Sequence, residues 1–127
     1  MTRNRSSAKA AGARMERLVA DYLAWELKDD RVDRRVKTGA KDRGDITGLR
    51  TPLGARLVVE VKDTAVLNLS GWLREATVEA GNDDAPHGVV VHKRRGHAAP
   101  ADQYVLMDLE TLAWLIAGGP KPEGASS

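Results

Sequence analysis

Residues 43–63 read RGDITGLRTPLGARLVVEVKD, and this stretch decides the fold because it predicts two antiparallel strands joined by a tight turn. The turn is TPLG at 51–54, since proline at its second position and glycine at its fourth are typical of a type I turn. Side chains two residues apart on a strand share a face. Glu60 and Lys62 therefore stand side by side on the return strand, and the turn folds Asp45 back toward them.

Outward from this hairpin, hydrophobic spacing predicts three helices and three further strands. The helices are expected over residues 7–27, capped by Ser7; over 68–80, capped by Asn68 or Ser70 and ended by Gly81; and over 109–117, capped by Asp108. The strands are expected at 32–36, 45–50, 55–63, 88–92 and 103–107. The order α-β-β-β-α-β-β-α is typical of an α/β domain with a central mixed sheet flanked by helices.

The chain length of 127 residues fits one domain. We expect that domain over residues 1–118, with residues 1–7 as a mobile basic arm. The segment 119–127, GPKPEGASS, is rich in glycine, proline and serine, which favours a disordered tail. The helix at 109–117 is apolar nearly all round, so we expect it to be well buried or to complete a dimer interface.

Composition excludes several classes of protein. The chain has no cysteine, which rules out disulfides and thiolate zinc sites and favours a reducing, cytoplasmic setting. No run approaches the roughly 20 apolar residues that a membrane span needs. Residues 1–50 hold 13 Lys and Arg against 8 Asp and Glu, whereas the rest of the chain is net acidic. A basic half suggests a surface for a polyanion such as nucleic acid.

The charged face of the hairpin predicts metal-dependent chemistry. Mg²⁺ and Mn²⁺ prefer oxygen ligands, commonly one or two carboxylates completed by water and substrate phosphate. Asp45 and Glu60 could converge on one such ion, and Lys62 could orient the attacking water or contact the phosphate. The alternative is that all three side chains face solvent on an outer strand, because a Glu-x-Lys pair often occurs by chance.

A further carboxylate lies upstream on the first predicted helix. Glu16 borders the apolar stripe of that helix, and glutamate is rarely buried without a partner. Taken alone, Glu16 is best interpreted as an edge residue paired with a neighbour such as Arg17. Together with the strand pair it becomes a candidate second carboxylate for the metal or its water.

Glu16 in AKAAGARME, Asp45 in RGDI and the run Glu60-Val61-Lys62 resemble the pattern of the PD-(D/E)XK nucleases. Within that superfamily the chain looks most like archaeal-type Holliday-junction resolvases and their phage relatives, over roughly residues 7–108. The resemblance implies a restriction-endonuclease-like core and a homodimer that cuts branched DNA with Mg²⁺, for which Mn²⁺ can substitute. It also implies a role in DNA recombination and repair, in the bacterial host cytoplasm if the gene belongs to a phage.

Carried over by residue, the resemblance makes Asp45, Glu60 and the backbone carbonyl of Val61 metal ligands. Lys62 becomes the catalytic lysine and Glu16 the supporting carboxylate and a further metal contact. Thr38, beside Gly39, occupies the place of a serine in a Ser-Gly loop and departs from that pattern, although its hydroxyl can do similar work. The residue before the aspartate is Gly44 rather than proline.

Basic residues surround the proposed site in sequence and could contact DNA phosphates. The candidates are Arg3, Arg5, Lys9, Arg14, Arg34, Arg35, Lys37, Lys41 and Arg43, followed by Lys93, Arg94 and Arg95 in a loop after a buried strand. For each one, a solvated surface position is an equally good interpretation.

Glu75 and Glu79 share a face of the second helix, and a solvent-exposed face is the favoured interpretation over an extra metal contact. Three alternatives to junction resolution remain open. The first is a repair or restriction nuclease of the same fold that acts on duplex, flapped or nicked DNA. The second is a non-catalytic DNA-binding module, and the third is an RNA endonuclease of related fold.

Overall fold

The computed structural model describes residues 4–37 and 39–124, and it has three helices around one mixed sheet. The elements follow the order α1 (Arg5–Leu27), β1 (Asp33–Arg34), β2 (Ile46–Thr47), β3 (Leu57–Lys62), α2 (Leu69–Asn82), β4 (His87–His92), a 3-10 turn η1 (Pro100–Asp102), β5 (Tyr104–Leu106) and α3 (Leu109–Ile116). Apart from η1, this is the order that the sequence predicts.

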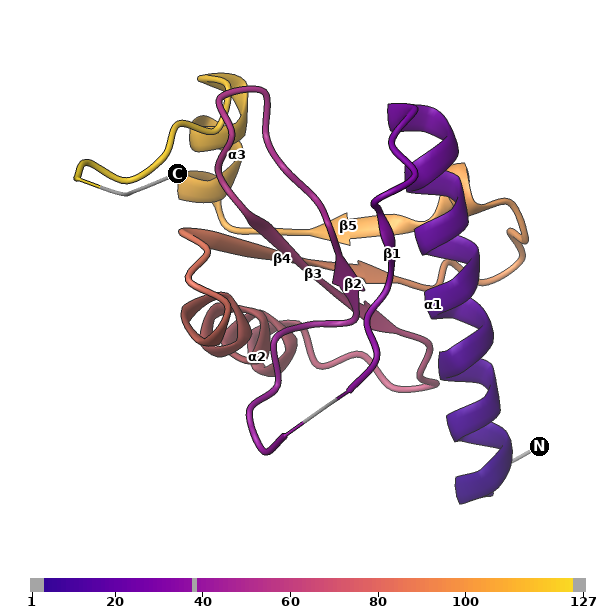
Figure 1. The fold of residues 1–127 in the computed structure, drawn as a ribbon. Helices are drawn as coiled ribbons and strands as arrows, with labels where there is room; N and C mark the ends of the chain where they lie inside the picture. Colours follow the sequence, from indigo (N-terminus) through magenta and orange to yellow (C-terminus); the bar gives the residue numbers. More distant parts are fainter. Residues whose placement is uncertain (1–3, 38, 125–127) are drawn as a thin grey trace.

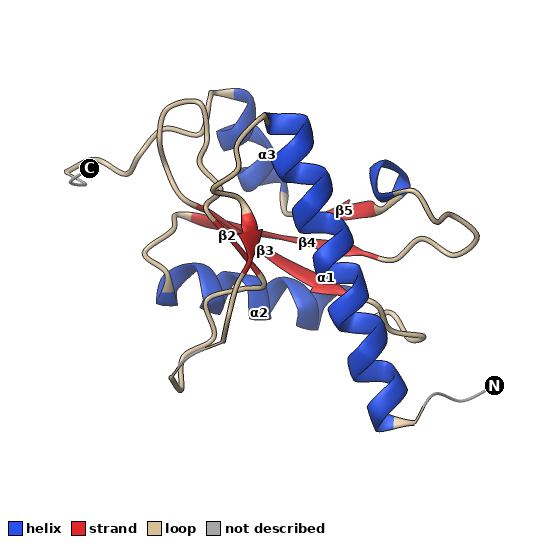
Figure 2. Cartoon of the chain, turned by 45° about the vertical axis from the view of Figure 1, so that its right-hand side comes forward, coloured by secondary structure: helices blue, strands red, loops and turns tan. Residues whose placement is uncertain are grey.

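The sheet has the spatial order β1-β2-β3-β4-β5, with β3 and β4 parallel and every other pair antiparallel. Figure 1 shows α1 and α2 on opposite sides of this sheet, and Figure 2 shows the same layers from another direction. The chain is therefore an α/β protein with a central mixed sheet.

The alternation expected along β3 is confirmed and sets the two sides of the core. Val59 and Val61 join the larger core cluster, which includes Met15 and Val19 of α1. Val58, on the opposite face of β3, packs with α2 through Ala80. Because side chains alternate along a strand, Glu60 and Lys62 share the Val58 face and are directed toward α2.

The turn at 51–54 is also confirmed, because Gly54 N donates to Thr51 O at 2.9 Å. The strands beside it are shorter than expected: pairing is limited to Ile46–Thr47 on one side, and an isolated bridge joins Arg50 and Arg56. The strand expected at 32–36 is likewise limited to Asp33–Arg34.

The helix termini confirm two expected caps and correct two other predictions. Asn68 and Asp108 are N-caps, accepting hydrogen bonds from the backbone amides of Gly71 and Thr111. The N-cap of α1 is Asn4, not Ser7, because the Asn4 side chain accepts the hydrogen bond from Ser7 N. Residues 5–7 therefore belong to α1 and not to a basic arm. Helix α2 continues through Gly81 to Asn82, so Gly81 does not end it as expected.

The C-terminal segment is partly held against the turn, which corrects the expectation of a disordered tail from residue 119. The buried hydroxyl of Thr51 donates to Gly119 O, and Pro120 forms a bridge with Gly54. Helix α3 is not well buried: Thr111 is its one buried residue, while Leu109 and Ile116 are each 79% exposed. The dimer alternative for this helix stays a prediction.

Replacing Thr51 with valine is expected to destabilise the protein by about 2 kcal/mol. The valine keeps the shape but leaves Gly119 O and the amide of Ala55, which donates to Thr51 Oγ1 at 3.0 Å, without their partner. Urea unfolding measures the change. Thr77→Val, which removes an exposed hydroxyl bonded within α2, should change stability by less than about 0.5 kcal/mol. Equal effects of the two variants would contradict the anchoring role of Thr51.

Candidate active site

Asp45 and Glu60 meet because β2 pairs with β3 immediately after Asp45. Ile46 lies opposite Val59, and Asp45 N donates to Val59 O at 3.0 Å. The amide of Val61 donates to Asp45 Oδ2 at 2.8 Å, which holds the carboxylate against β3. Asp45 is 2% exposed and Glu60 is 5% exposed. The hairpin thus brings the two carboxyls together, and both are buried instead of facing solvent.

Two further carboxylates join this site, and sequence reasoning did not place either one there. Asp42, Glu60 and Glu79 each offer an oxygen atom within 4.8 Å of the others. Glu79 is buried, so its interpretation as part of a solvent-exposed face is wrong. The sequence signal for Glu79 was its i+4 spacing from Glu75 on the helix after β3, whereas nothing marked Asp42 among the charged residues of its loop.

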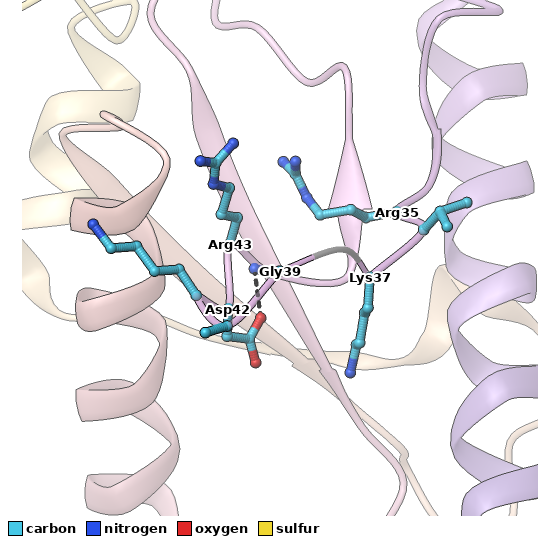
Figure 3. A pocket seen from close by; sticks show the side chains of 9 residues that line it. Arg35, Lys37, Gly39, Asp42 and Arg43 are labelled. Carbon is cyan, nitrogen blue, oxygen red and sulfur yellow. Dashed lines mark hydrogen bonds between the residues drawn. The ribbon is translucent and has the colours of Figure 1, made fainter.

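The loop that carries Asp42 is held by one hydrogen bond from α2 and one within the loop itself. Asn82 at the end of α2 donates its side-chain amide to Asp42 O at 2.7 Å, and Gly44 N donates to Asp42 Oδ1 at 2.9 Å. Figure 3 shows the Asp42 carboxylate and the Lys37 side chain directed to one side of this loop, with Arg35 and Arg43 directed to the other. Gly44 has φ +92°, and a Cβ there would lie 2.7 Å from a Val58 methyl group, so the close approach of loop and β3 requires glycine.

Burial and mutual repulsion make these carboxyls hard to ionise. Burial raises the pKa of Asp45 to about 7, and the neighbouring Glu60 adds to the shift. Burial also raises the pKa of Glu60 to about 8, with Glu79 contributing, although the contact with Asp45 acts in the opposite direction. The pKa of Glu79 rises to about 7 through burial and the charges of Asp42 and Asp45.

The site fits a bound divalent cation. Asp45 Oδ1 and Glu79 Oε2 are buried and accept no hydrogen bond from the described residues. Buried polar atoms ordinarily have a partner, and a buried charge is paired or coordinates a metal. An oxygen-only donor set is the kind that Mg²⁺ and Mn²⁺ prefer. These buried carboxylate oxygens are therefore of the kind that could hold a hard cation.

Two lysines border the carboxylates. Lys62 Nζ lies 2.8 Å from Glu75 Oε2, and Lys37 Nζ lies 3.6 Å from Asp45 Oδ1. Burial lowers the pKa of Lys62, but the contacts with Glu75 and Glu60 outweigh it and leave the pKa above its ordinary value. Both ammonium groups are thus kept protonated beside a cluster of acids. Lys37 was expected only as a phosphate contact.

The other residues predicted to bind the metal or act in catalysis are not part of the carboxylate group. Glu16 lies at α1 and accepts a hydrogen bond from Arg34 Nε at 2.8 Å, and it is outside the group formed by Asp42, Glu60 and Glu79. The structure connects Val61 to the site through its amide, while a role for its carbonyl stays a prediction. Thr38 lies outside the described residues, so its predicted role has no structural account.

Six of the basic candidates line two neighbouring hollows. One groove is lined by Lys9, Glu16, Arg17, Arg34, Arg35 and Lys37, and a neighbouring pocket of about 260 Å³ is lined by Arg35, Lys37, Lys41, Asp42 and Arg43 (Figure 3). Because Lys37 and Arg35 border both, the two hollows form one basic surface beside the carboxylates.

The remaining basic candidates lie elsewhere or are engaged in protein contacts. Arg35 is bonded to Asp83 at 3.2 Å, so it has a structural role as well. After β4, the guanidinium of Arg94 lies over the Tyr104 ring and the Lys93 ammonium donates to a backbone carbonyl. Arg95, Arg5 and Arg14 are on exposed or partly exposed surfaces, and Arg3 lies outside the described residues.

Comparison of the chain with protein-family models, curated proteins and solved structures found no match. Among the helices in the described parts of the chain, none combines the length and apolar character needed to cross a membrane.

Proposed function

We propose that this chain is a metal-dependent DNA endonuclease with a PD-(D/E)XK-type active site. The observation that carries the proposal is the buried Asp45–Glu60 pair, held on a hairpin with Lys62 on the same strand face. Buried acids with strongly raised pKa values beside a charged partner are typical of functional sites. The basic surface next to this cluster supports a polyanionic substrate.

In this proposal Asp45, Glu60 and the Val61 carbonyl would hold Mg²⁺ or Mn²⁺. Such an ion, when bound, stabilises negative charge on a phosphate and lowers the pKa of a water ligand. Glu16, which accepts a hydrogen bond from Arg34 Nε, would be the supporting carboxylate on α1.

The chain's own residues carry the remaining work. Lys62 contacts the scissile phosphate or orients the attacking water, and Glu75 holds its ammonium in place at 2.8 Å. Lys37, beside Asp45, is placed to bind an adjacent phosphate oxygen. Arg43 and Lys41 extend the basic surface along the loop, where they can contact DNA phosphates without any reading of bases.

We further propose a four-way DNA junction as the substrate and a homodimer as the active form. Two sites related by a two-fold axis would nick opposed strands symmetrically. Each chain supplies Asp45, Glu60 and Lys62 itself, so a nuclease acting on duplex, flapped or nicked DNA remains the second candidate.

A gel assay on synthetic four-way junctions and matched linear duplex, with Mg²⁺ or with EDTA, tests the proposal. We expect junction cleavage only with the metal, and Lys62→Met should lower the rate about 100-fold because a positioned donor to the developing negative charge contributes at least roughly that much. Lys121→Met, beyond α3, serves as the matched control and should cleave normally.

Failure of the wild type to cleave any DNA, or normal cleavage by Lys62→Met, would overturn the nuclease assignment. Equal cleavage of duplex and junction would favour the general nuclease over the resolvase. Light scattering separately tests the dimer, since a monomer at assay concentration would remove the argument for symmetric nicking.

A further inference from the structure

Glu79 is a buried acid that has no role in the proposed metal site of Asp45 and Glu60. It projects from α2 toward β3 and is 4% exposed. Its Oε2 atom is buried and takes no hydrogen bond from any described residue. Its near neighbours are other carboxyls: burial and the charges of Asp42 and Asp45 raise its pKa, and only the contact with Glu60 acts in the opposite direction, so no cationic group of the described residues is shown paired with it. A buried carboxylate in such surroundings needs a positive partner.

The geometry around Glu79 suits a cation as that partner. One oxygen each from Asp42, Glu60 and Glu79 lie within 4.8 Å of one another. Oxygen atoms this close need only small side-chain shifts to reach a common point at the roughly 2.0–2.6 Å that Mg²⁺, Mn²⁺ or Ca²⁺ requires. Asn82 anchors the Asp42 backbone from outside the cluster, so this arrangement exists without the cation.

This position differs from the one that Asp45 offers. Asp45 is outside the group of three, with Oδ2 occupied by the Val61 amide and Oδ1 facing Lys37 at 3.6 Å. Glu60 interacts with Asp45 and with Glu79, so it is the member common to both sets. An open groove lined by Asp42, Arg74, Glu75 and Glu79 connects the second set with solvent.

We propose that Asp42, Glu60 and Glu79 form a second divalent-cation subsite, with the Glu60 carboxylate shared between it and the Asp45 subsite. Mg²⁺ or Mn²⁺ is the class of ligand, because all three donors are carboxylate oxygens. The catalytic meaning of the subsite rests on the proposed nuclease function, where paired cations about 3.5–4 Å apart stabilise both the attacking and the leaving oxygen. Cation binding itself does not depend on that function.

The test is Mn²⁺ binding to the DNA-free full-length chain at pH 8, followed by electron paramagnetic resonance and calorimetry. The wild type is expected to bind two ions. Glu79→Gln and Asp42→Asn should each bind one ion, or bind the second at least tenfold more weakly, and Asp45→Asn should lose the other ion. Glu110→Gln on the exposed start of α3 should keep both. Circular dichroism checks that each variant is folded, and Asp42→Asn, at an exposed loop position, covers the case in which Glu79→Gln does not fold.

A wild type that binds one ion or none would overturn the inference, as would Glu79→Gln and Asp42→Asn variants that both bind two ions with unchanged affinity. Two ions in the wild type, one in these variants and no cleavage of any DNA would support the subsite and reject the nuclease. Metal-dependent cleavage by the wild type, with a single Mn²⁺ bound, would support the nuclease and reject the second subsite.

Discussion

Replacing Asp45 with asparagine is expected to lower DNA cleavage about 1000-fold while stabilising the cation-free protein by about 1–2 kcal/mol. Asparagine keeps a carbonyl oxygen that can accept the Val61 amide now bonded to Asp45 Oδ2. Its side-chain NH₂, in the place of Oδ1, can donate toward Glu60, and one of two neighbouring acids is removed. The Lys37 ammonium, now 3.6 Å from Oδ1, is mostly exposed and can turn to solvent. The same change removes a charged ligand from the proposed metal site, whose loss costs several kcal/mol of transition-state stabilisation.

The two effects are measured separately. Urea unfolding in EDTA at pH 8 gives the stability, and single-turnover cleavage with Mg²⁺ gives the activity. Asp21→Asn, at an exposed position of α1 where Asp21 pairs with Arg17, is the matched control and should leave cleavage unchanged. An Asp45→Asn variant that is less stable than the wild type in EDTA, or that cleaves within tenfold of it, would contradict this account of the cluster.

The cation-free protein is expected to lose roughly 3–7 kcal/mol of stability between pH 5.5 and pH 8.5, the lower figure if the three carboxyls titrate as a coupled group. Asp45, Glu60 and Glu79 have folded-state pKa values of about 7, 8 and 7, all above their ordinary values of 3.8 to 4.5. Between the unfolded and folded values the native chain binds more protons, so its stability falls as pH rises. This contribution is fully present below about pH 4 and is lost as the pH passes through 7 to 8.

Other titrating groups do not reverse this trend in the chosen range. The pKa values of Asp29, Asp33 and Asp108 are lowered by hydrogen bonds, so the stability that they contribute is already complete above pH 5. His92, whose pKa is lowered by burial, acts in the opposite direction around and below pH 6.5 only.

Thermal unfolding in EDTA at several pH values measures the loss, and the addition of Mn²⁺ at pH 8.5 should recover most of it, because a bound cation then compensates the charges. Asp45→Asn and Glu79→Gln should each flatten the pH dependence. Stability that rises steadily from pH 5.5 to 8.5 in EDTA would show that the three carboxyls ionise freely in the folded chain.

Local sequence patterns were enough to predict the parts of the site that lie on the hairpin. The period of two along a strand placed Glu60 and Lys62 on one face, and the TPLG turn returned the chain so that Asp45 meets Glu60. The caps Asn68 and Asp108 were predicted for the same reason, since each bonds an amide three residues away. The prediction of a Ser7 cap was wrong because Asn4, three residues earlier, accepts a hydrogen bond from Ser7 N and begins the helix there.

The carboxylates that complete the cluster could not be predicted in this way. Asp42 and Glu79 meet only because α2 packs on β3 and Asn82 holds the loop of Asp42 against the end of that helix. Local patterns in the sequence are sufficient to predict the hairpin, its charged face and the α/β order of elements. The burial of this face beneath α2, where four acids share it, depends instead on packing between distant segments, which no local periodicity records.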